Sequence, residues 1–459
     1  MLDALAEFRP PAPAPRSEAL GPLALLRVLS DNPLEAWTIA HFHEPLVVSG
    51  FSLGRVAVVS DPAAIRRVLI DNCANYEKDW LQRRVLSAGL TGGLLTAEGD
   101  DWRRQRRTLA PLFARKTVMS FAKTVRQAAN GLVDRLDQNK GEVVDMAVEV
   151  TRLTLDVLER TIFSDGLQRS TEDIRLAMKD YFETIGRLDP FDIFGVPEFV
   201  PRPRRWKLRP TRRLFDATID AIIAARRDRL AKDPKSAPAD LLTRLLEAAD
   251  PETGAGLSEQ QVRANILTFI AAGHETTANC IAWTLFLLSQ SDLWCERVRA
   301  EAERVLDGAS DDVADRLVET RAVIDEANRL YPPIAAISRT ARSPDVLAGV
   351  PIEQGMMVVI APYVLHRHRA IWTKPDVFDP NRFLGNAGSR SVDRFAYLPF
   401  GAGPRICIGA AFALQEASIV VSTLVRNFTM EIAPGYNAWP VQKVTLRLRG
   451  GLPMILRRR

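Results

Sequence analysis

A long helical pattern between Ser258 and Gln290 restricts the folds open to this chain more than any other feature. Ser258 and Gln261 have the spacing of a capping box, which marks the start of a helix. At a rise of about 1.5 Å per residue, this helix would be about 48 Å long, enough to cross a whole domain. We therefore expect an α-rich body built around it.

The remaining periodicity places helices in the middle of the chain and strands near its two ends. Alternating apolar and polar residues predict a hairpin over Pro45–Ser60, around Gly50 and Gly54, and strands over Val346–Tyr363. A further hairpin is predicted over Val441–Leu456, turning around Gly450-Gly451. The expected β-rich parts are 40–100, 340–365 and 440–456, and the expected helical body is 101–335 and 408–428. The pattern predicts a mainly α fold with a small β region.

Two proline-rich segments interrupt this pattern. The lead over residues 1–20 has a proline run from Pro10 to Pro15 and is expected to lie extended over the surface. Five prolines between Asp189 and Pro210 are expected to break the helices there. We expect residues 1–459 to form a single domain, although a chain of this length is usually divided.

The composition is that of an ordinary globular protein, and it narrows the classes of function. Of 459 residues, 47% are apolar and 25% are charged, and the net charge is +5. This mild basic excess does not indicate nucleic-acid binding. No stretch approaches the roughly 18 apolar residues of a membrane span, so no transmembrane anchor is expected. Four scattered cysteines predict no disulfide framework, which fits a cytoplasmic protein.

A glycine-rich loop carries Cys407 directly before a helical pattern that runs from Ala410 to Val425. The loop, Phe400–Gly409, reads Phe-Gly-Ala-Gly-Pro-Arg-Ile-Cys-Ile-Gly. Glycines allow the backbone to approach a large, flat group. At a helix entrance, unpaired N–H groups and the helix dipole favour the thiolate over the thiol. Most isolated cysteines are small buried hydrophobes, so the surrounding residues must decide between packing and metal ligation.

Three other segments combine residues that local stability does not require. Ala272-Gly273-His274-Glu275-Thr276 places an acid and an alcohol after a glycine in mid-helix, where glycine costs about 1 kcal/mol relative to alanine. A helix that opens a groove there would explain the glycine. Glu326 and Arg329 lie three apart on one helix face, and Trp102 and Arg106 lie four apart on another. Alone, each pair also fits packing or an ordinary surface ion pair.

Together, the four segments resemble the cytochrome P450 family, and the resemblance extends from Trp102 to Phe412. It implies the cytochrome P450 fold, with haem b (iron protoporphyrin IX) between the long central helix and the helix that follows the cysteine. Cys407 would be the iron ligand, and Phe400 and Gly409 would contact the cofactor and shelter the sulfur. A thiolate ligand favours O–O cleavage.

The resemblance also assigns roles to residues around the haem. Ala272 and Gly273 would lie against the cofactor. Thr276 would be the hydroxyl that contacts dioxygen, and Glu275 would relay protons to it, because oxygen reduction consumes protons. The residues expected to bind the haem propionates are Trp102, Arg106, Arg339 and Arg405.

A structural role is implied for the carboxylate of Glu326, which would lie between the guanidinium groups of Arg329 and Arg382. This arrangement would hold the scaffold on the haem side and take no part in catalysis. Asn381 stands where the family usually has glutamate, which leaves the minor contacts of that loop open.

Substrate and partner contacts follow from the resemblance alone. The side chains expected to line the substrate pocket are Phe191, Phe194, Phe269, Ile334, Ala335 and Ile337. All six are apolar, and a hydrophobic pocket recognises an apolar ligand mainly by its shape. Arg103, Arg104 and Arg107 would form a solvated basic face that could also dock an acidic electron donor.

These expectations describe a cytoplasmic, monomeric haem-thiolate monooxygenase. It would hydroxylate or epoxidise a lipophilic small molecule with dioxygen, and a separate ferredoxin or flavodoxin with its reductase would supply two electrons. Two alternatives keep the haem: a peroxide-dependent or rearranging enzyme, and a haem sensor or carrier without turnover. The acid and alcohol at Glu275 and Thr276 argue against the peroxide-dependent or rearranging enzyme. The sequence does not rank the substrates.

Overall fold

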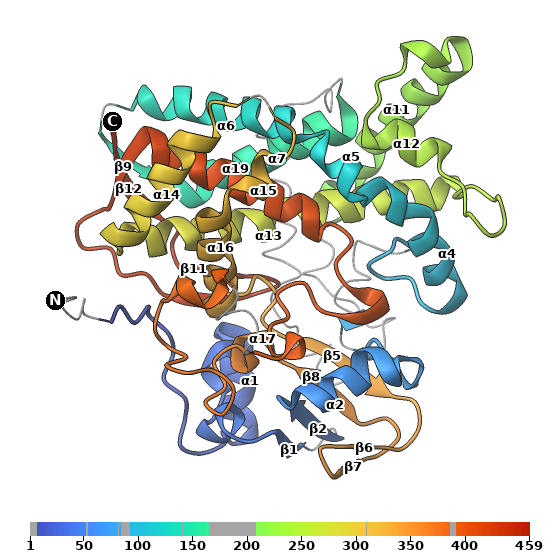
Figure 1. Cartoon of the computed structure of the whole chain (residues 1–459). Helices are drawn as coiled ribbons and strands as arrows, with labels where there is room; N and C mark the ends of the chain where they lie inside the picture. The colour runs from blue at the N-terminus through green and yellow to red at the C-terminus, as the bar shows by residue number, and fades with distance from the viewer. Residues whose placement is uncertain are drawn as a thin grey trace.

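The computed structural model describes residues 7–51, 54–80, 82–83, 92–139, 141–164, 208–308, 310–385 and 392–459. Figure 1 shows a large helical part and a smaller part with strands. The helices are α1 (Pro22–Asp31), α2 (Pro62–Arg66), α4 (Gly99–Leu109), α5 (Arg115–Met119), α6 (Ala122–Asp137), α7 (Met146–Leu158), α11 (Leu208–Lys232), α12 (Leu241–Glu247), α13 (Glu259–Ser289), α14 (Asp292–Val305), α15 (Val313–Arg316), α16 (Val318–Leu330), α17 (Pro362–Leu365) and α19 (Ala410–Asn427).

The strands form several small sheets. They are β1 (Leu46–Phe51), β2 (Gly54–Val59), β3 (Tyr76–Glu77), β4 (Val143–Asp145), β5 (Ile337–Ala341), β6 (Asp345–Leu347), β7 (Val350–Ile352), β8 (Met357–Ile360), β9 (Phe428–Ile432), β10 (Pro440–Gln442), β11 (Leu446–Leu448) and β12 (Pro453–Arg458). The largest sheet has the strand order β1-β2-β8-β5-β3. Its β1–β2 hairpin pairs Leu46 with Val59, and β2 runs parallel to β8.

The long central helix predicted from the sequence is confirmed as α13. The Ser258 hydroxyl accepts from the backbone N–H of Gln261, and the Gln261 side chain accepts from the backbone N–H of Ser258. These two bonds complete the capping box, because each satisfies a donor that the first turn leaves unpaired. The helix then packs against α7, α16 and α19. Within the described part of the chain, no helix has both the length and the apolar character of a membrane span.

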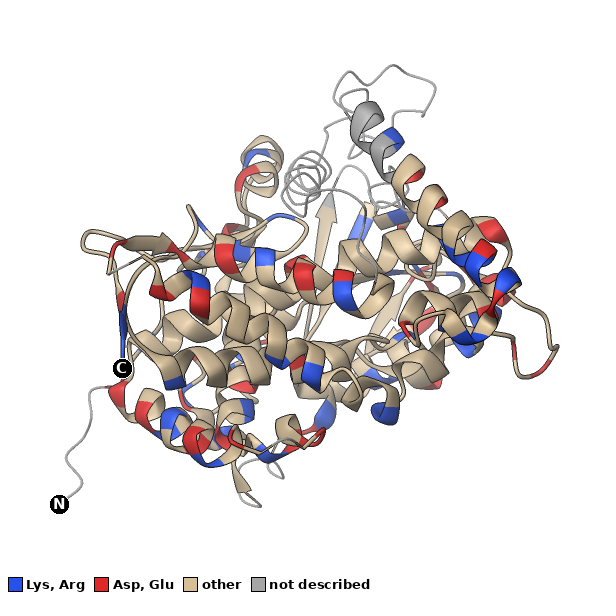
Figure 2. Cartoon of the chain, turned by 90° about the horizontal axis from the view of Figure 1, so that it is seen from above, with Lys and Arg blue, Asp and Glu red and all other residues tan. Residues whose placement is uncertain are grey.

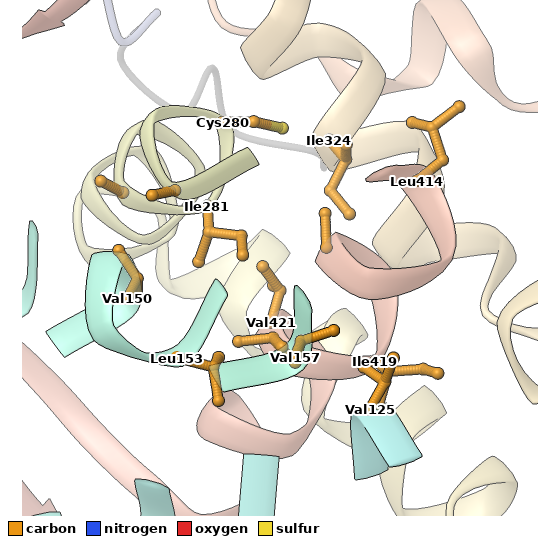
Figure 3. Close-up of a cluster of buried hydrophobic side chains, with 14 of the residues drawn as sticks. Val125, Val150, Leu153, Val157, Cys280, Ile281, Ile324, Leu414, Ile419 and Val421 are labelled. Carbon is orange, nitrogen blue, oxygen red and sulfur yellow. The ribbon is translucent and has the colours of Figure 1, made fainter. Parts of the chain in front are cut away.

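The main core lies where α6, α7, α13, α16 and α19 meet. Figure 3 shows Val150 and Leu153 of α7 close to Ile281 of α13 and Val421 of α19. All four side chains are buried. Each fully buried aliphatic side chain contributes about 1.5–3 kcal/mol to folding, so this contact holds the two helices that carry the candidate site.

The prediction of a hairpin around Gly450-Gly451 is wrong. β10 pairs with β11, so the hairpin turns earlier, over residues 443–445. Gly450 and Gly451 both have positive φ and lead from β11 into β12. β12 joins a different sheet, between β4 and β9. The glycine pair does mark a turn, but the local sequence does not encode which distant strands pair with β12.

Two expectations about the prolines are also corrected. The lead is packed in part: Pro10 is buried, and the Tyr331 hydroxyl donates to the Pro11 carbonyl at 2.8 Å. Pro210, the last of the five prolines, lies in the first turn of α11, which begins at Leu208, so this proline does not break a helix. A proline in the first turn lacks only an N–H that the helix leaves unpaired. The rest of that segment lies outside the described residues.

Glu416 of α19 is an unexplained carboxyl group in the core. It is fully buried, and neither side-chain oxygen has a hydrogen-bond partner in the described structure. Burial raises its pKa well above the ordinary value of 4.5. Because the folded state holds this proton more tightly than the unfolded chain, the contribution of Glu416 to stability falls as pH rises above about 4.5.

Glu416→Met is therefore expected to stabilise the protein at neutral and higher pH. We expect a gain of about 1–3 kcal/mol in the free energy of unfolding at pH 8, which shrinks toward pH 5. Urea denaturation of the wild type and the variant at both pH values measures this gain in the free energy of unfolding. The exposed Glu431 provides a control, since Glu431→Met removes a carboxyl group without relieving burial. Equal stability of Glu416→Met and wild type at pH 8 would contradict the assignment.

Candidate functional site

The loop before α19 has a backbone shape that requires glycine. Gly401 and Gly403 both have φ of +73°, in the region that favours glycine. A Cβ at Gly403 would overlap the backbone carbonyl of Leu69, so the loop and that segment are in direct contact. The backbone N–H of Cys407 donates to the Phe400 carbonyl at 2.9 Å, which closes the loop. The loop therefore holds Cys407 at the entrance of α19.

The sulfur of Cys407 lies in a mixed electrostatic environment. Cys407 is exposed by its accessible surface, yet desolvation by the surrounding protein raises the pKa of its thiol. The Gly409 N–H and the Arg106 guanidinium act in the opposite direction and lower it. The N–H at the helix entrance thus favours the thiolate, although it does not by itself produce one. A metal cation on the sulfur would, because a coordinating thiol loses its proton.

The middle of α13 presents Ala272 and Thr276 on one side. Ala272 is exposed, whereas the preceding residues from Thr268 to Ala271 are buried. The Thr276 hydroxyl donates to the Ala272 carbonyl at 2.7 Å, one turn earlier. The expected opening of the helix is not seen, because α13 is helical throughout. Gly273 instead allows close packing, since a Cβ there would lie 3.1 Å from the Leu158 side chain of α7.

Glu275, the predicted proton relay, points to a partner that the sequence did not suggest. Its Oε1 accepts from the Thr445 hydroxyl at 2.7 Å, and its Oε2 is buried without a hydrogen-bond partner in the described structure. Burial raises the pKa of Glu275, and the Thr445 bond and the Arg447 charge lower it to a smaller extent. Thr445 follows β10 and belongs to no motif, so a local pattern could not have identified it.

Four cationic side chains, here called the cation cluster, gather near the Cys407 loop. Its members are Lys78, Arg106, Arg339 and Arg405. The Arg405 guanidinium lies 4.2 Å from the centroid of the Trp102 ring on α4. Burial lowers the pKa of every member, and charge repulsion from Arg405 adds to the shift at Lys78 and Arg339. These effects place Lys78, Arg339 and Arg405 within range of one another's charge, whereas Arg106 acts on Cys407.

The cation cluster is not neutralised by its described neighbours. Glu98 forms an ion pair with Arg405 and lies 3.5 Å from the Lys78 ammonium group. Asp79 is the other carboxylate that acts on the cluster, through Arg339, and it accepts from the Ser338 hydroxyl. Four cations thus face two carboxylates among the described residues. A ligand with two carboxylates would balance the charge.

Lys78 is a member of the cluster that sequence reasoning missed. It is 5% exposed, and its ammonium group donates to the carbonyls of Leu95 at 2.5 Å and Ala97 at 3.2 Å. Burial lowers its pKa to about 8. Neither Lys78 nor Glu98 belongs to a motif, and only the fold brings them together. Buried lysines are rare, which makes this one a candidate ligand-binding group.

Glu326 lies between two arginines, as the resemblance implies. Arg329 donates to its carboxylate through Nε at 2.6 Å and Nη2 at 2.8 Å, and both side chains are fully buried. Arg382 Nε lies 3.5 Å from Oε1, which also accepts the Asp379 N–H at 2.8 Å. Asn381 does not reach this group, and its amide instead donates to the Asp379 carboxylate.

Arg329 also fixes the chain that follows α17. It donates to the backbone carbonyls of His366, Pro375 and Val377 at 2.7–3.0 Å. These bonds link α16 to a segment without regular structure, for which the guanidinium fork supplies the missing donors. The ion pair is therefore part of the scaffold.

The basic face expected on α4 is largely paired with acids. Arg103 pairs with Asp100, and Arg104 lies 3.5 Å from Asp101. Arg107 makes two hydrogen bonds of 2.9–3.0 Å to Asp250. Figure 2 shows the same interspersed charges along the outer helices. These three arginines are less available to an acidic partner than the sequence suggested.

The predicted substrate-pocket residues have different environments. Ile334 is 37% exposed and Ile337 is half-buried. Ala335 is buried, and Phe269 packs edge-on against Phe113 with the ring centroids 5.1 Å apart. Phe191 and Phe194 lie outside the described residues. Ile334 is thus the most accessible of the predicted pocket residues that the structure describes.

Comparisons with known proteins agree with this arrangement. The family model for cytochrome P450 matches residues 10–451. Cyclooctatin synthase from Streptomyces melanosporofaciens is 30% identical, covering 96% of this chain and 94% of that protein. Cyclooctat-9-en-7-ol 5-monooxygenase from the same organism is 30% identical, covering 88% of this chain and 86% of that protein. Protein LUTEIN DEFICIENT 5 from Arabidopsis thaliana is 30% identical, covering 84% of this chain and 67% of that protein.

Solved structures show the same fold. The cytochrome P450DA haem domain superposes with a TM-score of 0.84 at 25% identity, covering 98% of this chain and 99% of that one. A second cytochrome P450 structure has a TM-score of 0.82 at 27% identity. The chain belongs to the cytochrome P450 family. It is accordingly a haem-thiolate oxidoreductase of a family whose named relatives include monooxygenases and hydroxylases, and which uses a small-molecule substrate and a redox partner.

Proposed function

We propose that the protein is a monooxygenase that hydroxylates or epoxidises a lipophilic small molecule. One dioxygen, two electrons and two protons would yield one oxygenated product and one water. The arrangement of Cys407 at the entrance of α19, with Thr276 and Glu275 on α13, supports this proposal most strongly. The names of the two Streptomyces relatives support oxidation of an apolar substrate.

The residues present fit haem b. Cys407 would ligate the iron, and the turn at Gly401 and Gly403 would let the backbone approach the ring. The excess of two positive charges in the cation cluster matches two propionates, with Trp102 as an additional N–H donor. When bound, the haem supplies activation of dioxygen, which its thiolate ligand promotes.

Two side chains of α13 would hold and transfer protons near the substrate. Thr276 would exchange its bond to the Ala272 carbonyl for a bond to the oxygen reactant. Glu275 would hold a transferable proton, because burial favours its neutral form. Exposed Ala272 and Ile334 would form the apolar surface against which the substrate lies. Such a surface selects for shape, so we propose lipophilic molecules as a class.

Electrons would come from a separate ferredoxin or flavodoxin with its reductase, and we propose that the protein acts as a cytoplasmic monomer. Since Arg103, Arg104 and Arg107 are paired with acids, docking would rely on shape and apolar contact at exposed Pro404 and Ile406 as well as on charge.

Substrate-dependent consumption of NADH and oxygen, with ferredoxin and reductase added, tests this function. We expect lipophilic ligands to shift the spin state of the haem iron and to increase the consumption of NADH and oxygen. Oxygenated product should form at the same time. Thr276→Ala is expected to divert electrons from product to peroxide. Equal turnover of Thr276→Ala, with peroxide as the sole oxidant, would favour a peroxide-dependent enzyme. Haem binding without turnover for any ligand would favour a sensor or carrier.

A further inference from the structure

The β10–β11 turn reaches the acid of α13 through a single hydroxyl group. Thr445 is 2% exposed and lies between β10 and β11, far from α13 in sequence. Its Oγ1 is 2.7 Å from Glu275 Oε1 and 3.1 Å from the Asn279 amide nitrogen. Glu275 and Asn279 are four apart on α13, so they flank the hydroxyl from one face of the helix.

The chemistry of the three groups sets the direction of the bonds. The Asn279 amide N–H donates to Thr445 Oγ1, since an amide nitrogen has no lone pair to offer. The hydroxyl hydrogen of Thr445 is then free to point at Glu275, and Oε1 accepts it. When Glu275 is protonated, Oε1 is therefore the carbonyl oxygen, and the acid proton belongs on Oε2.

Oε2 is the oxygen that remains available. It is buried and has no hydrogen-bond partner in the described structure. A buried carboxyl oxygen without a partner is costly, and such groups often mark function. Arg447, on the strand that follows Thr445, acts on Glu275 through its charge only. The turn thus fixes one oxygen of the acid and leaves the other free.

We propose that Thr445 is a positioning residue that orients Glu275 and directs its transferable proton to Oε2. The inference rests on the proposed function, because it concerns the acid of the same site. In each turnover, Glu275 gives the Oε2 proton toward the oxygen reactant and regains one from water, so the carboxyl group ends unchanged. Its precise orientation matters because small errors in the placement of a reacting group are costly.

Two Thr445 variants and one matched control test the proposal in the haem-loaded protein. Thr445→Val removes the hydroxyl but keeps the shape, and Thr445→Ser restores the hydroxyl. Thr284→Val is the control, because Thr284 is also buried and its hydroxyl donates to the Cys280 carbonyl of its own helix. We expect Thr445→Val to lower the fraction of NADH electrons that appear in product by about 10- to 100-fold. Thr445→Ser and Thr284→Val are expected to stay near wild type.

Infrared difference spectroscopy against Glu275→Gln gives a readout that needs no turnover. We expect a carboxyl C=O band from Glu275 in the wild type, and we expect it to move to higher frequency in Thr445→Val, because Oε1 loses a hydrogen bond. An unchanged band in Thr445→Val, or unchanged coupling of electrons to product, overturns the proposal. A wild-type protein that binds haem but never oxygenates a substrate overturns the proposed function instead, and the infrared band still tests the orientation.

Discussion

Cys407→Ser is expected to remove the haem-thiolate centre and, with it, the activity. A serine hydroxyl is a far weaker iron ligand than a thiolate, and it does not supply the electron density that promotes O–O cleavage. We expect product formation to fall by about 10³-fold or more, an increase of about 4 kcal/mol in the activation free energy. The absorption spectrum of the purified protein, with and without carbon monoxide, checks the ligand independently of activity.

A variant at a cysteine outside the site distinguishes the loss of the iron ligand from a general loss of stability. Cys295→Ser is the matched control, because Cys295 is a half-buried free cysteine of α14. It should keep the wild-type spectrum and rate. The loop should still fold in Cys407→Ser, since the backbone bond from residue 407 to Phe400 involves no side chain. A Cys407→Ser protein with an unchanged thiolate spectrum would show that another residue ligates the iron.

Glu326→Ala is expected to have the largest effect on stability. Truncation leaves Arg329 fully buried without its carboxylate, and Arg382 without its main ion-pair partner. Removing one member of a buried pair costs about 3–5 kcal/mol, because the other charge remains in the interior. Urea denaturation measures the loss, and we expect little haem-loaded protein to be recovered at 37 °C.

Two further variants show whether charge or shape is responsible. Glu326→Gln keeps the shape but not the charge, so an intermediate loss is expected. Glu353→Ala breaks the exposed pair with Arg55 and should cost less than about 1 kcal/mol. If Glu326→Ala were as stable as Glu353→Ala, the buried pair would not hold the scaffold as described.

The parts of the fold that local sequence encodes were predicted well. The capping box at Ser258 and Gln261 placed the start of α13, and alternation placed the β1–β2 hairpin, because both signals arise within a few residues. The glycine pair at Gly450 and Gly451 was misread. A turn is a local event, but the partner of β12 is chosen by packing far along the chain.

The residues of the site also fall into those that local sequence predicts and those that only the tertiary fold brings together. Motifs indicated Cys407 and the ion pair of Glu326, because the family resemblance lies in contiguous residues. Lys78 and Thr445 could not be found from the sequence, since each acts through one contact made by the tertiary fold. The pKa of Cys407 combines both kinds of information: the helix-terminal N–H group that lowers it is visible in the sequence, whereas the desolvation that raises it depends on the surrounding chain.

The reduced carbon monoxide difference spectrum of the purified, haem-loaded protein tests the central claim most directly. Thiolate ligation of the iron would shift the Soret band of the carbon monoxide complex to a distinctly longer wavelength than a neutral ligand would. We expect the long-wavelength band in the wild type and its absence in Cys407→Ser. A wild-type protein that binds stoichiometric haem but shows only the short-wavelength band would contradict ligation of iron by Cys407.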